Sequence, residues 1–185
     1  MKSLCFGLAL LLALAHVANP VRPETYRNPG PPFAIDYPDG WKILPGEGGL
    51  ATRAIGPGSA MNVSVAAARS PDFDVDRFTG AELEQIADEL AAATAGALRS
   101  FELIERGRAE LGGKPAAWFS YRAVVDSPGG RVETVGHYVA TAHQGLVYSV
   151  TGVTQQRLQR RMQPEIMKAI RSFRFTEPAA PRPAE

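Results

Sequence analysis

The stretch Phe33-Ala34-Ile35-Asp36-Tyr37-Pro38-Asp39-Gly40-Trp41 opens the region that decides the fold. From Phe33 to Tyr37 large apolar side chains alternate with smaller or polar ones, which is the period of a half-buried strand. The Pro38-Asp39-Gly40 segment is typical of a turn. Trp41 to Leu44 is therefore predicted to be the next short strand.

More strands are predicted further along the chain, where the alternation returns between glycine-containing turns. Two are expected near Ala51–Ile55 and Met61–Ala67, after a glycine-rich connection. Short turns in the second half demand neighbouring antiparallel strands. The resulting four-strand meander is predicted at Phe101–Leu111, Pro115–Val125, Arg131–Thr141 and Leu146–Thr151.

Two helices separate or follow these strands. Thr79 and Glu82 have the spacing of a capping box, and the helix that they begin is expected to end near Ser100. A second helix is predicted over Gln155–Ser172, with a kink or restart at Pro164, because proline removes a helical hydrogen bond. The fold class is therefore α+β, a central and mostly antiparallel sheet sandwiched by helices.

The N-terminus has the pattern of a secretory signal over residues 1–18, with Lys2 before an apolar run that is too short to span a bilayer. We expect an exported protein, periplasmic or extracellular, with no stable membrane span after cleavage. Residues 19–32 are rich in proline and predicted to be a disordered linker. The domain is expected over 33–175, and 176–185 is predicted to be a disordered tail.

The charges are balanced, which argues against a polyanion-binding protein. Lys and Arg number 20 and Asp and Glu number 19, and loss of Lys2 with the signal leaves 20 − 1 = 19 of each. The best basic cluster is Arg157, Arg160 and Arg161, which is typical of a solvated helix face. Nucleic acid is therefore not expected as a partner. The single cysteine, Cys5, lies in the signal, so disulfides and thiol chemistry are excluded from the mature protein.

Three segments carry a resemblance to a known family. They are Phe33–Trp41, Leu111-Gly112-Gly113-Lys114-Pro115-Ala116 and Ile170-Arg171-Ser172-Phe173, and their order and spacing resemble the PsbP-like proteins, which include the DcrB-related envelope proteins. The resemblance implies an antiparallel sheet sandwiched by helices that acts as a binding or accessory module. The family has no shared catalytic motif, so it implies no functional residue.

No segment has the pattern of an active site, a metal site or a cofactor site. The mature chain has two histidines, His137 and His143, but no nucleophile elbow. Asp72, Asp74 and Asp76 alternate as calcium ligands could, yet the later positions of an EF-hand loop do not match, and an acidic approach to the following helix is favoured. We therefore predict no catalytic, cofactor-binding or metal-binding residue, and a protein that is not an enzyme.

The candidate binding surface consists of two tryptophans and the arginine cluster. Trp41 and Trp118 could line a ligand groove, although core packing is the favoured reading, and Trp118 falls on the strand face opposite to its aromatic neighbours. We predict a monomeric envelope module that binds an unidentified protein partner. The alternative is a carrier or sensor of a small apolar ligand, in a cleft between the sheet and the long helix. An envelope hydrolase that uses His137 or His143 is a third hypothesis.

Overall fold

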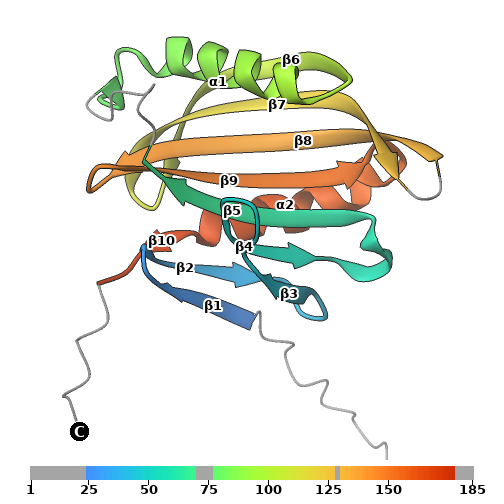
Figure 1. The fold of residues 1–185 in the computed structure, drawn as a ribbon, viewed down its shortest axis with the longest axis horizontal. Coiled ribbons are helices and arrows are strands. Elements are labelled where there is room, and N and C mark those ends of the chain that lie inside the picture. Colours follow the sequence, from blue (N-terminus) through green and yellow to red (C-terminus); the bar gives the residue numbers. More distant parts are fainter. Residues whose placement is uncertain (1–23, 70–76, 128–129, 178–185) are drawn as a thin grey trace, which may run out of the picture.

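The computed structural model of the chain describes residues 24–69, 77–127 and 130–177. A large and a small antiparallel sheet and two helices make up these residues (Figure 1). The expected signal over 1–18 and the aspartates at 72, 74 and 76 lie outside the described residues. No helix of the described part has the length and apolar character needed to cross a membrane.

The central sheet has seven strands in the order β3-β4-β5-β9-β8-β7-β6, and all neighbours are antiparallel. The predicted four-strand meander is confirmed as β6 to β9. β5 joins the sheet by pairing with β9, far along the chain. The strands are β3 (Lys42–Pro45), β4 (Leu50–Ile55), β5 (Met61–Ala68), β6 (Ser100–Leu111), β7 (Lys114–Ser127), β8 (Gly130–His143) and β9 (Leu146–Gln155).

The small sheet corrects one sequence-based expectation. It has three strands in the order β1-β2-β10, with bounds Glu24–Pro29, Pro32–Tyr37 and Arg174–Phe175. The linker predicted over 19–32 is therefore wrong for residues 24–32, and the fold begins before residue 33. Proline is tolerated here because it stands at strand ends and β1 is an edge strand. Tyr26 also packs against the ring of Phe33, at a centroid distance of 6.1 Å.

The first helix, α1 (Leu83–Ala97), lies across β6 and β7 on one face of the central sheet. The predicted capping box is wrong: the helix begins after Glu82, whose side chain makes no cap hydrogen bond. Arg77 Nε donates to Glu82 Oε2 at 2.6 Å instead. Thr79 lies in the turn that precedes the helix.

The second helix, α2 (Gln159–Ser172), lies on the opposite face of the sheet, against β9, β5 and β2. A 3₁₀ turn, η3 (Gln156–Leu158), precedes it. The restart expected at Pro164 is wrong, because one helix runs through that residue. Pro164 is exposed, so water can reach the backbone group that loses its helical partner.

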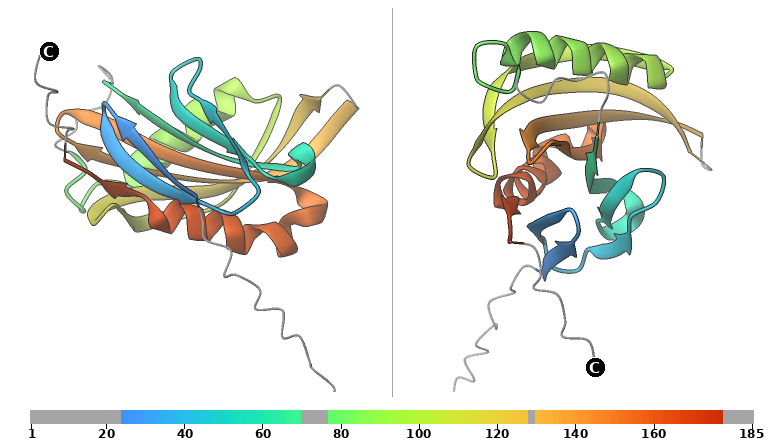
Figure 2. Two further views of the ribbon diagram at one scale, coloured as in Figure 1. Left: turned by 90° about the horizontal axis from the view of Figure 1, so that it is seen from below. Right: turned by 60° about the vertical axis from the view of Figure 1, so that its left-hand side comes forward.

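Side chains that alternate along the strands form one core on each face of the central sheet, and the predicted sandwich is confirmed (Figure 2). β7 shows the alternation. Phe119 and Tyr121 pack under α1, whereas Ala116 and Trp118 face the side of α2 and the small sheet. Trp118 therefore lies opposite its aromatic neighbours, as its strand phase predicts.

Candidate functional site

Three open grooves lie next to one another at a single end of the central sheet. They lie where β7 and β9 end, where β5 and β8 begin, and where η3 leads into α2. Shared lining residues join them. One groove shares Gly58 and Met61 with a second groove, and it shares Val132 and Gln155 with the third. The grooves therefore form one continuous candidate surface, which we call the groove end.

The α1 groove, of about 610 Å³, lies beside the residue that caps the C-terminal end of α1. Leu98 lines it from that end, and Tyr121, Ala123 and Val153 line it from the central sheet. The ring of Tyr121 is held by Phe101, with centroids 5.3 Å apart and planes 22° apart. No residue of α1 itself lines this groove, so it lies beyond the end of the helix and is not the cleft predicted between the sheet and the long helix.

The Trp41 groove, also of about 610 Å³, lies on the other side of Met61. Trp41 is 7% exposed and is part of the core, so only an edge of its ring can be reached from the groove. Met162 contributes a flexible apolar side chain from α2. Arg161 and Glu165, from the exposed side of the same helix, give the groove a mixed charge.

The Arg131 groove, of about 480 Å³, is the most polar of the three. Arg131 and Glu133 reach it from β8, and Arg157 reaches it from η3. Arg157 Nε donates to Gln155 Oε1 at 2.9 Å, which fixes the guanidinium beside the groove. Its other N–H groups remain available to an acceptor on a bound molecule.

The structure brings some of the predicted surface residues together and separates others. Trp41 and Arg161 share a groove, and Arg157 lines the neighbouring one. Arg160 is exposed on α2 but lines none of the three. Trp118 lies on a different part of the sheet, half-buried over Gly107, where a Cβ would lie 3.1 Å from its Nε1.

Sequence reasoning did not single out Tyr121 or Met61 as surface candidates. Both look like ordinary core positions on alternating strands, because the pattern gives a residue's face but not how far its neighbours cover it. Tyr121 is 6% exposed and lines a groove because it lies beside Leu98, where α1 has ended.

Neither histidine lines this surface, and the two have different surroundings. His137 is 8% exposed on β8, between Ser120 on β7 and Gly152 on β9, and its Nε2 has no hydrogen-bond partner among the described residues. Burial lowers its pKa. His143 lies at the far end of β8, its ring 4.1 Å from that of Phe175.

Neither histidine is oriented by a carboxylate in the described residues, and neither lines one of the three grooves. Burial, and to a lesser extent the charge of Lys114, lowers the pKa of His143. Within the described ranges no three His, Cys, Asp or Glu side chains gather as metal ligands would. The geometry of the groove end, with apolar floors and arginine rims, suits binding of another molecule.

Comparison with known proteins identifies the fold. No protein-family model matches the chain, and no curated protein matches it in sequence. Cyanobacterial PsbP (CyanoP) from Synechocystis sp. PCC 6803 superposes with a TM-score of 0.65 at 17% identity, over 89% of this chain and 99% of that one. The chain therefore has a PsbP-like fold.

Two further solved structures share this architecture. LpqN of Mycobacterium tuberculosis, which is involved in cell envelope biogenesis, has a TM-score of 0.54 at 12% identity, over 86% of this chain and 93% of that one. A protein of Bacteroides thetaiotaomicron has a TM-score of 0.54 at 13% identity, over 89% of this chain and 52% of that one. These superpositions establish the fold. At sequence identities this low they show no more than the fold, so the relation to DcrB-related proteins stays a prediction.

Proposed function

We propose that this chain is an exported, non-catalytic accessory module of the bacterial envelope that binds a protein partner through its groove end. The proposal rests on the continuity of the three grooves. Structural likeness to LpqN, a protein involved in cell envelope biogenesis, is compatible with it. The main support is the amino-acid composition of the surface that the three joined grooves form.

That composition is the one found at protein interfaces. Tyrosine, tryptophan, methionine and arginine are enriched there, and buried aromatic and arginine anchors supply most of the binding energy. Tyr121, Trp41 and Met61 line the grooves from the sheet and the loops around it. Exposed arginines stand at the rims: Arg53, Arg131, Arg157 and Arg161.

The test is capture of partners from the native envelope with the tagged chain, after mild crosslinking and with mass spectrometry. The groove variant Arg53→Gln, Arg131→Gln, Arg157→Gln removes three rim cations without touching the core. A specific partner is expected to be captured by the wild-type chain and at least tenfold less by the groove variant, because interface arginines often contribute more than 1 kcal/mol each.

The matched control is the variant Arg160→Gln, Lys168→Gln, Arg171→Gln, which also removes three exposed cations but touches none of the three grooves. It should capture the partner as the wild type does. Equal loss in both variants would mean that net charge, and not the groove end, drives capture. Equal capture by all three proteins would place the partner on another surface.

A second function is favoured by the α1 groove, which has apolar side chains such as Leu98 and Val153 in its lining and, like the other two grooves, a volume within the range of small-molecule sites. In that case the chain carries or senses a small apolar ligand beside the end of α1. Native mass spectrometry of the chain isolated from its own envelope should then show a bound lipid or metabolite. A Val153→Trp substitution would fill the groove and abolish that adduct, while capture of a protein partner would be unaffected only if the two functions are separate.

A further inference from the structure

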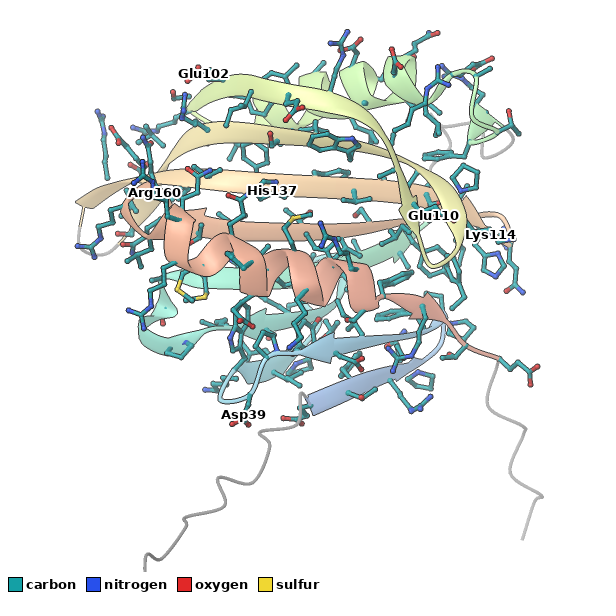
Figure 3. The ribbon with its side chains drawn as sticks, turned by 180° about the vertical axis from the view of Figure 1, so that it is seen from behind. Asp39, Glu102, Glu110, Lys114, His137 and Arg160 are labelled. Atoms are coloured by element: carbon teal, nitrogen blue, oxygen red, sulfur yellow. The ribbon has the colours of Figure 1, made fainter. Side chains whose placement is uncertain are left out.

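The outward face of α2 carries a row of cations. Arg160, Arg161, Lys168 and Arg171 are all exposed, whereas Ile166, Ala169 and Ile170 on the opposite side of the helix are buried. At about 100° per residue these four cations share one side, and from 160 to 171 they extend over about 16 Å. We call this row the α2 ridge. In Figure 3 the helix lies in front of the sheet, with Arg160 labelled near its first turn.

Among the described residues no carboxylate lies within ion-pair distance of the ridge cations, which is also true of Arg53, Arg131 and Arg157. The ridge is distinguished by having four such cations on one side of one helix. Glu165 is the single acid of α2, and it faces the Trp41 groove. The four cations of this face thus outnumber the one acid of their helix.

The acids of α1 show the opposite arrangement. Glu84 and Asp88 pair with Arg108 and Arg106 of β6, and Glu89 pairs with Arg77. The Arg77 guanidinium lowers the pKa of the Glu89 carboxyl. A chain whose total charge is close to zero thus has one neutralised helix and one positive helix on opposite faces of its sheet.

From this arrangement we infer that the α2 ridge docks the protein electrostatically on an anionic phospholipid surface. The helix α2 lies at the outside of the molecule (Figure 2). Its four exposed cations share one side, so their charged groups can reach a flat surface together. Each basic residue near an anionic bilayer strengthens binding about fivefold. Arg161 belongs both to the ridge and to the Trp41 groove, so the two surfaces meet at the start of this helix.

A lipid surface fits the ridge better than a protein does. A specific protein interface needs apolar or aromatic anchors at its centre. Pro164 lies among the ridge cations, and no aromatic side chain is present on α2. The two methionines of the helix, Met162 and Met167, are partly buried against the core. Electrostatic attraction to many identical lipid head groups needs no such anchor. The groove end, in contrast, has aromatic side chains that can serve as anchors for a protein partner.

The test is sedimentation of the full chain with vesicles of phosphatidylcholine, with and without phosphatidylglycerol. The ridge variant is Arg160→Gln, Lys168→Gln, Arg171→Gln, and the groove variant Arg53→Gln, Arg131→Gln, Arg157→Gln is the charge-matched control. All three proteins share residues 1–23, so a difference between them reports the substituted surface. All six positions are exposed, and circular dichroism checks that each variant is folded.

The wild-type chain should bind the phosphatidylglycerol vesicles in preference to the neutral ones and lose that preference in high salt. The ridge variant should bind about a hundredfold more weakly, and the groove variant within about fivefold of the wild type. Equal weakening in both variants, or no preference of the wild type for anionic vesicles, would overturn the inference. So would ridge-dependent binding to poly-glutamate without binding to vesicles, which would assign the ridge to an acidic polypeptide.

Discussion

Tyr121 on β7 lies directly over Gly136 on β8, its cross-strand partner. A Cβ on residue 136 would lie 2.2 Å from Cζ of the tyrosine ring, so only glycine leaves room for the ring against the sheet. The same ring lines the α1 groove and stacks on Phe101. One missing side chain thus positions a residue of the candidate binding surface.

Gly136→Ala is therefore expected to destabilise the fold by about 1–3 kcal/mol, because the methyl group must displace the tyrosine ring. Urea unfolding followed by circular dichroism measures this. Gly96→Ala in α1 is the control, since a Cβ there meets nothing within 4 Å and a helical Gly-to-Ala change stabilises by about 0.5–1 kcal/mol. An unchanged midpoint for Gly136→Ala would show that the ring does not rest on this glycine in solution.

A second close approach seats α2 on the sheet. A Cβ on Gly152 would lie 2.1 Å from Cγ2 of Ile166. Gly152→Ala should destabilise by about 1–3 kcal/mol and Ile166→Ala by about 2–5 kcal/mol. The loss of unfolding free energy in the double variant should be smaller than the sum of the two single losses by at least about 1 kcal/mol. The added methyl group then occupies space that the isoleucine vacates. Additive losses in the unfolding free energies would contradict this contact.

The buried imidazole of His137 predicts a dependence of stability on pH. Burial lowers its pKa in the folded protein, so below about pH 6.5 the unfolded chain binds more protons than the folded one. Its contribution is complete above the unfolded pKa and is lost as the pH falls toward the lowered folded value. His137→Gln should flatten the fall in unfolding free energy between neutral and mildly acidic pH.

The control for this prediction is His143→Gln, because the pKa of His143 is also lowered but its side chain is less buried. It should change the pH profile less than His137→Gln does. A His137→Gln profile parallel to that of the wild type would mean that the imidazole titrates with an ordinary pKa in the folded protein.

The two tryptophans offer a direct probe of the groove end, because they are the only ones in the chain. Trp118→Phe leaves Trp41 as the single fluorophore, and Trp41→Phe leaves Trp118. Binding at the Trp41 groove should shift the emission of the first variant and leave the second unchanged, since Trp118 packs over Gly107 on another part of the sheet. The reverse result would place the bound molecule on the sheet beside Trp118.

Much of the fold follows from local patterns in the sequence. The alternation from Phe101 to Thr151 and the short turns within it predict β6 to β9, and a hairpin turn leaves few alternatives to pairing with the next strand. The face of Trp118 follows from the same period of two. The two helices are also predicted, although α1 begins after Glu82 without the expected capping box and α2 continues through Pro164.

The sequence by itself determined the class of this protein: an α+β domain with an antiparallel meander, two helices and a resemblance to PsbP-like proteins. The tertiary structure alone decided that β5 pairs with β9, that β1 and β10 join β2 in a second sheet, and that three grooves meet at one end. These features depend on pairings between residues distant in the chain. Local periodicity fixes which way a side chain points, but long-range packing decides what lies opposite it and whether it stays uncovered.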